Sequence, residues 1–472
     1  MENREYSIEE LQEMLTSKKV TSRELVDFYL DRISEHDGFL NSLADLNNHA
    51  YAQADALDKE RATGKVRSLL HGIPIVLKDN IFTKGSMRTT VSSYAFSNFY
   101  APYDAYLVKR LKESGAIILG KANLSEFAYF MSMGKMPSGF GSMHGQVKSP
   151  YHKDIDPLGS STGSAVSVAA NLATASVGTE TNGSLMSPAQ QNSVVSIKPT
   201  VGLVSRSGIV PISYLQDTAG PMTRTVRDAA IMLTNMQGMD EEDESTLSIP
   251  KEEDYLQACV SDLKGYRIGV IDFKNYKMDE EELNIIKEAK EQLEKAGAEI
   301  VELSYEYDLP NNLLALTHHF KHDLNAFLGS TSNHTPVKSL LELIRFNHAN
   351  AKRCLKYGQT HFLQAEATSG QLKDQEYLEH LKESNASIAR YMHQFDAYKL
   401  DVLMSTKITG YPAVGGYPVM AVPAKELRDT RPISMIFVGQ KWQEKKLVSV
   451  AYTYEQATNH RVAPDLSKRK AD

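Results

Sequence analysis

The segment 157–225 constrains the fold most, because it is dense in Gly, Ser, Thr, Ala and Pro and carries few charges. A flexible linker of this composition would lack long apolar runs, whereas 165–177 is packed with Ala and Val and 194–197 is a second apolar run. Small side chains let backbone segments approach one another closely. The segment is therefore predicted to be a tightly packed interior and not a disordered spacer.

Helical segments alternate with apolar strands along the chain. The first forty residues predict two helices, each opened by a capping box, Ser7 with Glu10 and Thr21 with Glu24. An apolar run at 73–77 predicts a buried strand that ends at Lys78. Further strands are predicted at 116–119, 194–197, 267–272, 299–303, 402–404, 419–422 and 433–438, and further helices at 104–114, at 279–296 and over most of 309–397. This alternation predicts an α/β fold.

Composition excludes several classes of protein. The chain has 472 residues, 42% of them hydrophobic, so it can bury a large core. A net charge of -7 argues against nucleic acid as the main partner, and no run approaches the ~20 apolar residues of a membrane span. The N-terminus lacks the apolar core of a secretory signal, and Cys259 and Cys354 are expected to be buried thiols. A cytoplasmic protein without a structural metal is predicted.

Three motif-like patterns are set aside. The run 159–163 matches G-x-S-x-G, which would make Ser161 a nucleophile, but the proline and aspartates before it argue against the required strand. The tail 467–470 matches S-x-x-K at a charged chain end that cannot supply a buried pair. His318, His319 and His322 have metal-compatible spacing, but no third ligand is evident nearby, and a polar helix surface is favoured. The acidic run 240–244 predicts a solvated loop.

A stronger constellation comes from the segments 72–80, 159–165 and 178–184. Lys78 follows an apolar strand, where burial would lower the pKa of its amine and make it a usable base. Ser160 and Ser184 lie 24 residues apart, and an Ala-rich helix between them could fold one beside the other. The run 181–184 can turn consecutive backbone N–H groups to one side as a nest for an oxyanion.

These three segments resemble the signature of the amidase signature family, whose members carry a Ser–cis-Ser–Lys triad. The similarity runs from about residue 7 to the segment 433–464, and it is densest at 71–80, 115–128 and 157–225. Within the family the chain looks most similar to peptide amidases, through the runs 178–184, 198–206 and 216–222.

The resemblance implies a single α/β/α domain over 1–472 with a mixed central sheet covered by helices. Its parts would be a helical segment at 1–65, a catalytic core at 66–240 and a region at 241–472 that completes the domain. Position by position, it implies that Lys78 is the base, Ser160 the cis-serine and Ser184 the nucleophile. The oxyanion hole of the family corresponds to the backbone N–H groups of Thr181, Asn182, Gly183 and Ser184. Ser161 corresponds to a neighbouring serine that supports the triad by hydrogen bonding.

The implied reaction is hydrolysis of a carboxamide, such as a peptide C-terminal amide, to a carboxylate and ammonia. Neutral Lys78 would take the proton of Ser160, which takes that of Ser184, and Ser184 would form an acyl-enzyme that water hydrolyses. No cofactor or metal is needed. The partner is a small-molecule or peptide amide, and the pocket walls are expected from 128–140 and 309–397.

Some residues depart from the family pattern, and two other functions stay open. One is that of an A-type subunit in a glutamyl-tRNA amidotransferase, against which the apolar Met186 and the run 178–184 count. The other is a catalytically weak binding protein on the same scaffold. It is suggested by the departures Asn182, Met186, Gln190, Gln191, Ser193 and Ser196; Thr162 is a further departure from the family pattern.

Overall fold

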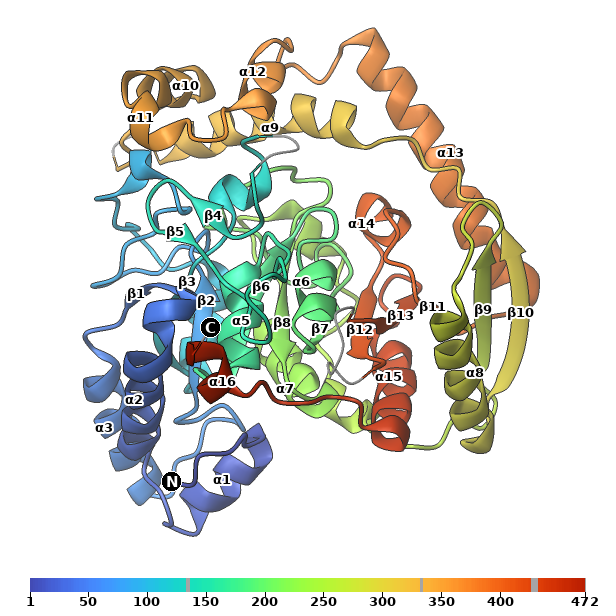
Figure 1. Ribbon diagram of the computed structural model, residues 1–472, viewed down its shortest axis with the longest axis horizontal. Helices are drawn as coiled ribbons and strands as arrows, with labels where there is room; N and C mark the ends of the chain where they lie inside the picture. The colour runs from blue at the N-terminus through green and yellow to red at the C-terminus, as the bar shows by residue number, and fades with distance from the viewer. Residues whose placement is uncertain (133–135, 332–333, 426–431, 472) are drawn as a thin grey trace.

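One mixed sheet of eleven strands runs through the computed structural model, which describes residues 1–132, 136–331, 334–425 and 432–471 (Figure 1). Neighbours β2, β3 and β6 are parallel, as are β9, β10 and β11, whereas β1 and the central strands pair antiparallel. In spatial order the strands are β1 Leu43–Leu46, β3 Ile117–Ala122, β2 Pro74–Lys78, β6 Ala175–Glu180, β8 Thr218–Thr223, β7 Val195–Lys198, β12 Val419–Pro423, β13 Ser434–Gly439, β11 Val402–Ser405, β9 Arg267–Phe273 and β10 Glu299–Tyr305. The predicted α/β class and mixed sheet are confirmed.

Helices cover both faces of the sheet, because successive strand residues point to opposite sides. Val76 packs on one face among residues of α2, α3 and α5, whereas Ile75 and Leu77 pack on the other face in the cluster that holds α4 and α7. The first face carries α2 Ser22–Leu40, α3 Ala50–Ala62, α5 Thr162–Ala169 and α6 Met186–Gln191; the second carries α4 Tyr106–Glu113, α7 Val226–Met236, α8 Glu280–Lys295 and α15 Glu444–Thr458.

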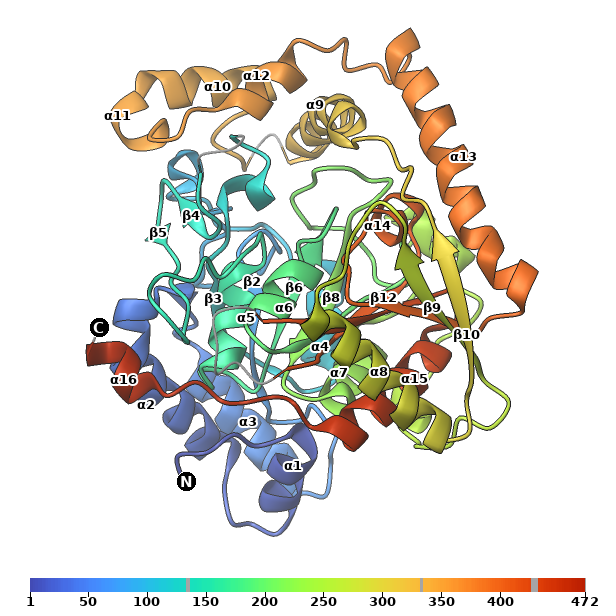
Figure 2. The same ribbon diagram turned by 45° about the vertical axis from the view of Figure 1, so that its right-hand side comes forward.

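A group of helices lies across one edge of the sheet (Figures 1 and 2). It is joined to the core by side chains of α9, among them Asp323, whose carboxylate accepts a hydrogen bond of 2.7 Å from the Tyr214 N–H. The group comprises α9 Leu313–Ser330, α10 Leu340–Ala349, α11 Ala351–Cys354, α12 Thr360–Glu366 and α13 Gln375–Tyr398, with α14 Tyr411–Gly415 beneath α13. We call α9–α13 the helical cap.

Short elements complete the chain. Both predicted capping boxes are present, and the one at Ser7 opens α1. The remaining elements are α1 Ile8–Thr16, α16 Leu466–Ala471, the hairpin β4 Phe140–Gly141 with β5 Gly145–Gln146, and the 3₁₀ turns η1 Tyr94–Phe96, η2 Glu126–Tyr129, η3 Glu244–Ser248 and η4 Tyr255–Ala258. Cys259 and Cys354 are buried free thiols, as predicted. In the part of the chain that the structure describes, no helix is long and apolar enough to span a membrane.

Two predictions of exposed polar surface are wrong. His318 and His319 on α9 are 2% exposed, because α9 packs against α12 and α13, and Tyr377 of α13 contacts both histidine rings. In the acidic run, Asp240 and Asp243 are buried, since Asp240 accepts from the Ser205 hydroxyl and Asp243 pairs with the Arg206 guanidinium. Only the remaining three glutamates of that run lie at the surface.

Candidate active site

The predicted site residues meet at one edge of the sheet. Lys78 is the last residue of β2 and Glu180 the last of β6, and these neighbouring strands are parallel, so they end at the same edge. β8 runs antiparallel to β6 and begins there at Thr218. The segments 179–184 and 216–217 therefore lie beside the end of β2.

Lys78 is surrounded by oxygen atoms. Its amine is fully buried and donates to Ser160 Oγ at 2.8 Å, Ser161 Oγ at 2.9 Å and Thr179 Oγ1 at 2.8 Å. A fourth contact, to the Thr179 carbonyl oxygen, is 3.2 Å long. An ammonium group has three N–H donors, and the Ser160 or Thr179 hydroxyl can instead donate to the lone pair of a neutral amine. The shell therefore suits a lysine that gains and loses a proton.

The pKa of Lys78 is lowered to about 7. Burial is the largest cause, because removal from water penalises the charged amine, and the negative charges of Asp217 and Glu180 oppose it. Among the residues that the structure describes, no carboxylate lies within ion-pair distance of the amine. Lys78 is thus a buried amine with a large neutral fraction at neutral pH, as the sequence predicts.

Ser160 and Ser161 lie where α5 begins. The Gly159–Ser160 peptide bond is cis. The Ser161 hydroxyl donates to the Thr179 carbonyl at 2.9 Å and accepts from the Thr179 N–H at 3.1 Å, so it joins the start of α5 to β6. This pairing holds both serines against the Lys78 amine.

Ser184 is the outermost member of the group. Its carbonyl accepts a hydrogen bond of 3.2 Å from the Ser161 N–H, which brings the loop 181–184 beside the two serines. The Ser184 residue is 8% exposed, whereas Lys78 and Ser160 are 0% exposed. Among the described residues, no hydrogen bond joins the Ser160 and Ser184 hydroxyls. The structure brings Ser184 next to the pair and leaves that last contact open, as is common in ligand-free sites.

The loop 181–184 presents backbone N–H groups. Within the described residues, the N–H groups of Thr181, Asn182, Gly183 and Ser184 donate to no protein acceptor. The next two N–H groups, of Leu185 and Met186, are bound by Glu180 Oε2 at 2.7 and 3.1 Å. Gly183 has a φ of +81°, in the left-handed region that glycine adopts without a steric cost. Such an arrangement can bind an anionic oxygen.

Sequence reasoning missed four residues that position this group. Thr179 supplies two of the oxygens around Lys78, and its hydroxyl also accepts from Asn80 Nδ2 at 3.0 Å. Asp217 accepts from the Thr181 hydroxyl at 2.5 Å and from the Ser213 N–H at 2.9 Å, and burial raises its pKa to about 6. Gln216 Nε2 donates to the Thr181 carbonyl at 3.1 Å. The run 216–222 was the available signal, but it did not assign these contacts.

The histidines of α9 do not form a metal centre. His319 accepts or donates through both ring nitrogens, to the Ser213 hydroxyl at 2.7 Å and the Tyr377 hydroxyl at 2.8 Å. Burial lowers the pKa of His319 to about 4, so the ring is neutral. Over the described ranges no group of three or more His, Cys, Asp or Glu side chains could hold a metal ion.

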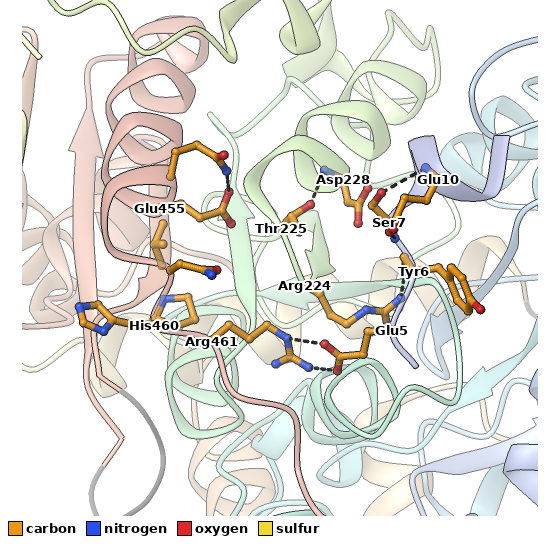
Figure 3. Close-up of a pocket in the computed structure, with 14 residues that line it drawn as sticks. Glu5, Tyr6, Ser7, Glu10, Arg224, Thr225, Asp228, Glu455, His460 and Arg461 are labelled. Atoms are coloured by element: carbon orange, nitrogen blue, oxygen red, sulfur yellow. Dashed lines mark hydrogen bonds and ion pairs between the residues drawn. The ribbon is translucent and has the colours of Figure 1, made fainter. Parts of the chain in front are cut away.

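A hollow of about 240 Å³ lies at the opposite edge of the sheet (Figure 3). It is lined by Val422 and Pro423 at the end of β12 and by Arg224 just after β8. Figure 3 shows the Arg461 guanidinium joined to the Glu5 carboxylate across it. None of the predicted site residues lines this hollow. It lies where the first residues of the chain pack against the core.

Known proteins resemble this chain along almost all of its length. The family model described as Amidase matches residues 24–448. A probable amidase of Arabidopsis thaliana is 38% identical over 469 residues, which cover 98% of this chain and 91% of that protein. A protein of Thermosynechococcus vestitus, described as the A-type subunit of glutamyl-tRNA(Gln) amidotransferase, is 34% identical and matches 97% of this chain and 99% of its own.

Solved structures agree with the sequence relatives. The native peptide amidase of Stenotrophomonas maltophilia superposes with a TM-score of 0.91 at 38% identity, over 98% of this chain and 99% of that one. An amidase family protein from Bacillus anthracis superposes with the same TM-score, over 98% of this chain and 92% of that protein.

Proposed function

Because the chain belongs to the amidase family, and is therefore a hydrolase that acts on amide bonds, we propose that it releases ammonia from a carboxamide through an acyl-enzyme on Ser184. The substrate class that we propose is the C-terminal amide of a peptide. The observation that carries the proposal is the fully buried Lys78 amine, 2.8 Å from the Ser160 hydroxyl and with its pKa lowered to about 7.

The first proposed step is proton transfer along the three residues. Neutral Lys78 takes the proton of Ser160, and Ser160 takes the proton of Ser184 as Ser184 Oγ bonds to the amide carbon. The Ser161 N–H, next in sequence to Ser160, already bonds to the Ser184 carbonyl, and this contact would hold the two serines side by side during the transfer. Protonated Lys78 keeps hydrogen-bond acceptors on Thr179 and Ser161.

The second proposed step is stabilisation of the tetrahedral intermediate. Its negative oxygen would be bound by the N–H groups of the loop 181–184, each contributing about 3 kcal/mol to the transition state. The proton then returns through Ser160 to the leaving nitrogen, so that ammonia departs and the C–N bond breaks. Water hydrolyses the acyl-enzyme by the same route, which restores Ser184 and Lys78.

The peptide-amide class is supported by similarity to the Stenotrophomonas maltophilia peptide amidase along 98% of this chain. The relatives named as amidotransferase subunits supply a second candidate, amide transfer from glutamine inside a complex. Free ammonia release by the isolated chain from a peptide amide, with little release from glutamine, distinguishes the two. A cytoplasmic location is also proposed, in keeping with two buried free thiols.

The test is ammonia release from peptide amides, aliphatic amides and aryl amides by the wild type and by Ser184→Ala, Ser160→Ala and Lys78→Ala. We expect peptide amides to be turned over and each substitution to lower kcat by about three orders of magnitude or more. A fluorophosphonate should label wild-type Ser184 and leave Ser184→Ala unlabelled. Undiminished turnover by Ser184→Ala would overturn the proposal, and an unlabelled, inactive wild type would favour a binding protein.

A further inference from the structure

Two peptide units of the loop 181–184 are held in place through their carbonyl groups. The Gly183 carbonyl accepts a hydrogen bond of 2.8 Å from the N–H of Ser187, in the first turn of α6. The Thr181 carbonyl accepts instead from a side chain, Gln216 Nε2, at 3.1 Å, and within the described residues this is its one hydrogen-bond partner. The backbone of a helix therefore holds the first of these units, and a single side chain holds the second.

The direction of a carbonyl group also fixes the direction of the N–H that follows it. In a trans peptide unit the C=O and the N–H point in opposite directions. Among the described residues the cis bond lies at Gly159–Ser160, so the unit 181–182 is trans. Because the Thr181 carbonyl is turned toward Gln216, the Asn182 N–H is turned away from it. In the described part of the chain this N–H donates to no protein acceptor. Gln216 therefore sets the direction of an open N–H group without contacting it.

The unit 181–182 has an alternative orientation that Gln216 prevents. Thr181 is 7% exposed, and its hydroxyl donates to Asp217 Oδ1 at 2.5 Å, which holds the residue beside 216–217. A buried carbonyl oxygen without a donor is costly. Without the Gln216 amide, the Thr181 carbonyl would be stabilised by turning toward solvent, which the next residue, Asn182, already reaches. That turn would remove the Asn182 N–H from the site and put a carbonyl oxygen in its place.

The orientation of the Gln216 amide is itself fixed at both ends. The Thr181 carbonyl can only accept, so the NH₂ group of Gln216 faces it, and the oxygen of Gln216 then needs a donor. Asn312 Nδ2 supplies that donor at 3.0 Å. Gln216 is 2% exposed and Asn312 6% exposed, so both contacts are shielded from solvent. Asn312 directly precedes α9, and two side-chain amides therefore join the helical cap to the loop 181–184.

Gln216 and Asn312 also line a hollow of about 450 Å³, together with residues of α13. The expectation that 309–397 supplies a pocket wall fits this lining. The described residues of 128–140 do not line it, and 133–135 lie outside the described residues. The two amides thus connect the wall of this hollow with the loop that follows β6.

We propose that Gln216 is a positioning residue for the oxyanion hole, and that Asn312 acts through Gln216. Gln216 holds the unit 181–182 so that the Asn182 N–H faces the substrate carbonyl oxygen and stabilises the tetrahedral intermediate. The helical cap keeps Gln216 in the orientation that does this. The inference rests on the proposed acyl-enzyme mechanism, in which the loop 181–184 binds the oxyanion.

The first experiment compares the wild type with Gln216→Met, which is close to Gln in volume and has no N–H to donate. We expect kcat for a peptide amide to fall about 100-fold with KM little changed, as for the loss of one oxyanion-hole donor. The rate at which a fluorophosphonate labels Ser184 should fall in parallel, because the phosphonyl oxygen uses the same N–H groups. The pH midpoint of kcat/KM should stay in place, since neither side chain brings a charge near Lys78.

Gln237→Met is the matched control. Gln237 is also buried, and its NH₂ group donates to the backbone carbonyls of Thr234 and Glu253, neither of which belongs to the site. This substitution removes a buried amide of the same kind, so it should leave kcat and the labelling rate at the wild-type values.

The second experiment tests whether Asn312 acts through Gln216. Asn312→Leu should lower kcat about 5- to 10-fold alone and cause no further loss in a Gln216→Met background, because Asn312 then has no amide to orient. Asn312→Asp should lower kcat more than Asn312→Leu, although Asp is the closer match in shape. Its carboxylate attracts the Gln216 NH₂ group and turns the Gln216 oxygen toward the Thr181 carbonyl. These rates are compared at pH 9, where Lys78 is neutral.

Wild-type ammonia release and labelling are measured first, so a failure of the proposed activity is seen separately. A Gln216→Met variant with a normal urea midpoint and the kcat of the wild type would overturn the inference. A fall in kcat without a fall in the labelling rate would do so too, as would additive losses from Gln216→Met and Asn312→Leu. If Gln216→Met does not fold, the two Asn312 variants decide: higher activity in Asn312→Asp than in Asn312→Leu would contradict the proposed orientation.

Discussion

The pH dependence of ammonia release should follow the protonation of Lys78. The neutral amine is the active form, and burial lowers its pKa from 10.5 to about 7, so kcat/KM should rise with pH and level off above about pH 8. With a pKa of about 7, about one amine in eleven is neutral at pH 6 and about ten in eleven at pH 8, a tenfold rise in rate. At pH 7.5 about three amines in four are neutral, against about one in a thousand for a lysine of pKa 10.5.

The assay is ammonia release at substrate concentrations far below KM, from pH 5.5 to pH 9.5 at constant ionic strength. Asp217→Asn tests the cause, because the Asp217 charge raises the pKa of Lys78 and its removal should move the midpoint to lower pH. Glu455→Gln is the matched control. Burial raises the pKa of Glu455 to about 7 as well, but it lies at the opposite edge of the sheet beside the hollow in Figure 3, so its substitution should leave the midpoint unchanged.

Two results would refute this reasoning. A rate that keeps rising tenfold per pH unit through pH 9 would mean that the base has the pKa of an ordinary lysine. A midpoint that moves upward in Asp217→Asn would mean that the Asp217 charge does not act on the titrating group as its position requires.

Three further substitutions have distinct expected effects. A Cβ atom at Gly178 would lie 2.8 Å from Ser161 Oγ, so Gly178→Ala should destabilise the fold by about 1 to 3 kcal/mol in urea titrations and lower kcat; an active variant of normal stability would contradict this. Thr179→Val removes an acceptor shared by Lys78 and Asn80, and we expect a loss of about 1 to 3 kcal/mol in unfolding free energy and a lower kcat, with Thr179→Ser as the control that restores both. Glu5→Gln weakens the pairing with Arg461 and should cost about 1 to 2 kcal/mol of stability while kcat stays unchanged, because the pair lies at the opposite edge; a change in kcat would show that the two edges are coupled.

Local patterns predicted most of the elements that build the site. The capping boxes, the apolar run before Lys78 and the strand at 194–197 each depend on residues within a few positions, and each is present. The resemblance added the pairing of Lys78 with Ser160, 82 residues apart, which no local pattern contains.

Strand β8 shows why part of the fold was missed. Its sequence has no alternation and contains Gly220 and Pro221, which favour a turn or an edge. The segment is nevertheless a central strand, because β6 and β7 lie on either side and both pair with it. The Pro221 carbonyl accepts from the Ser196 hydroxyl at 2.9 Å, a partner that the segment itself does not reveal.

The buried side chains of the helical cap were mispredicted for a related reason. The partners of His319 are Ser213, 106 residues before it, and Tyr377, 58 residues after it. Asn312 likewise donates to Gln216, which in turn donates to the Thr181 carbonyl, and both partners are distant in the sequence. Helical spacing describes one helix face and cannot say what packs against it.

Gly178 and Gly220 are paired directly across β6 and β8. A Cβ atom at Gly220 would lie 2.0 Å from the Ile197 carbonyl oxygen, and one at Gly178 would lie 2.6 Å from Leu185. These two positions on β6 and β8, beneath the nucleophile, therefore cannot hold a larger side chain than glycine. A directed-evolution library that randomised Gly178 and Gly220 would consist mainly of misfolded members. New substrate ranges should be sought instead at the exposed positions of α13, such as Asn385 and Ala389, where a change of side chain does not disturb the buried core.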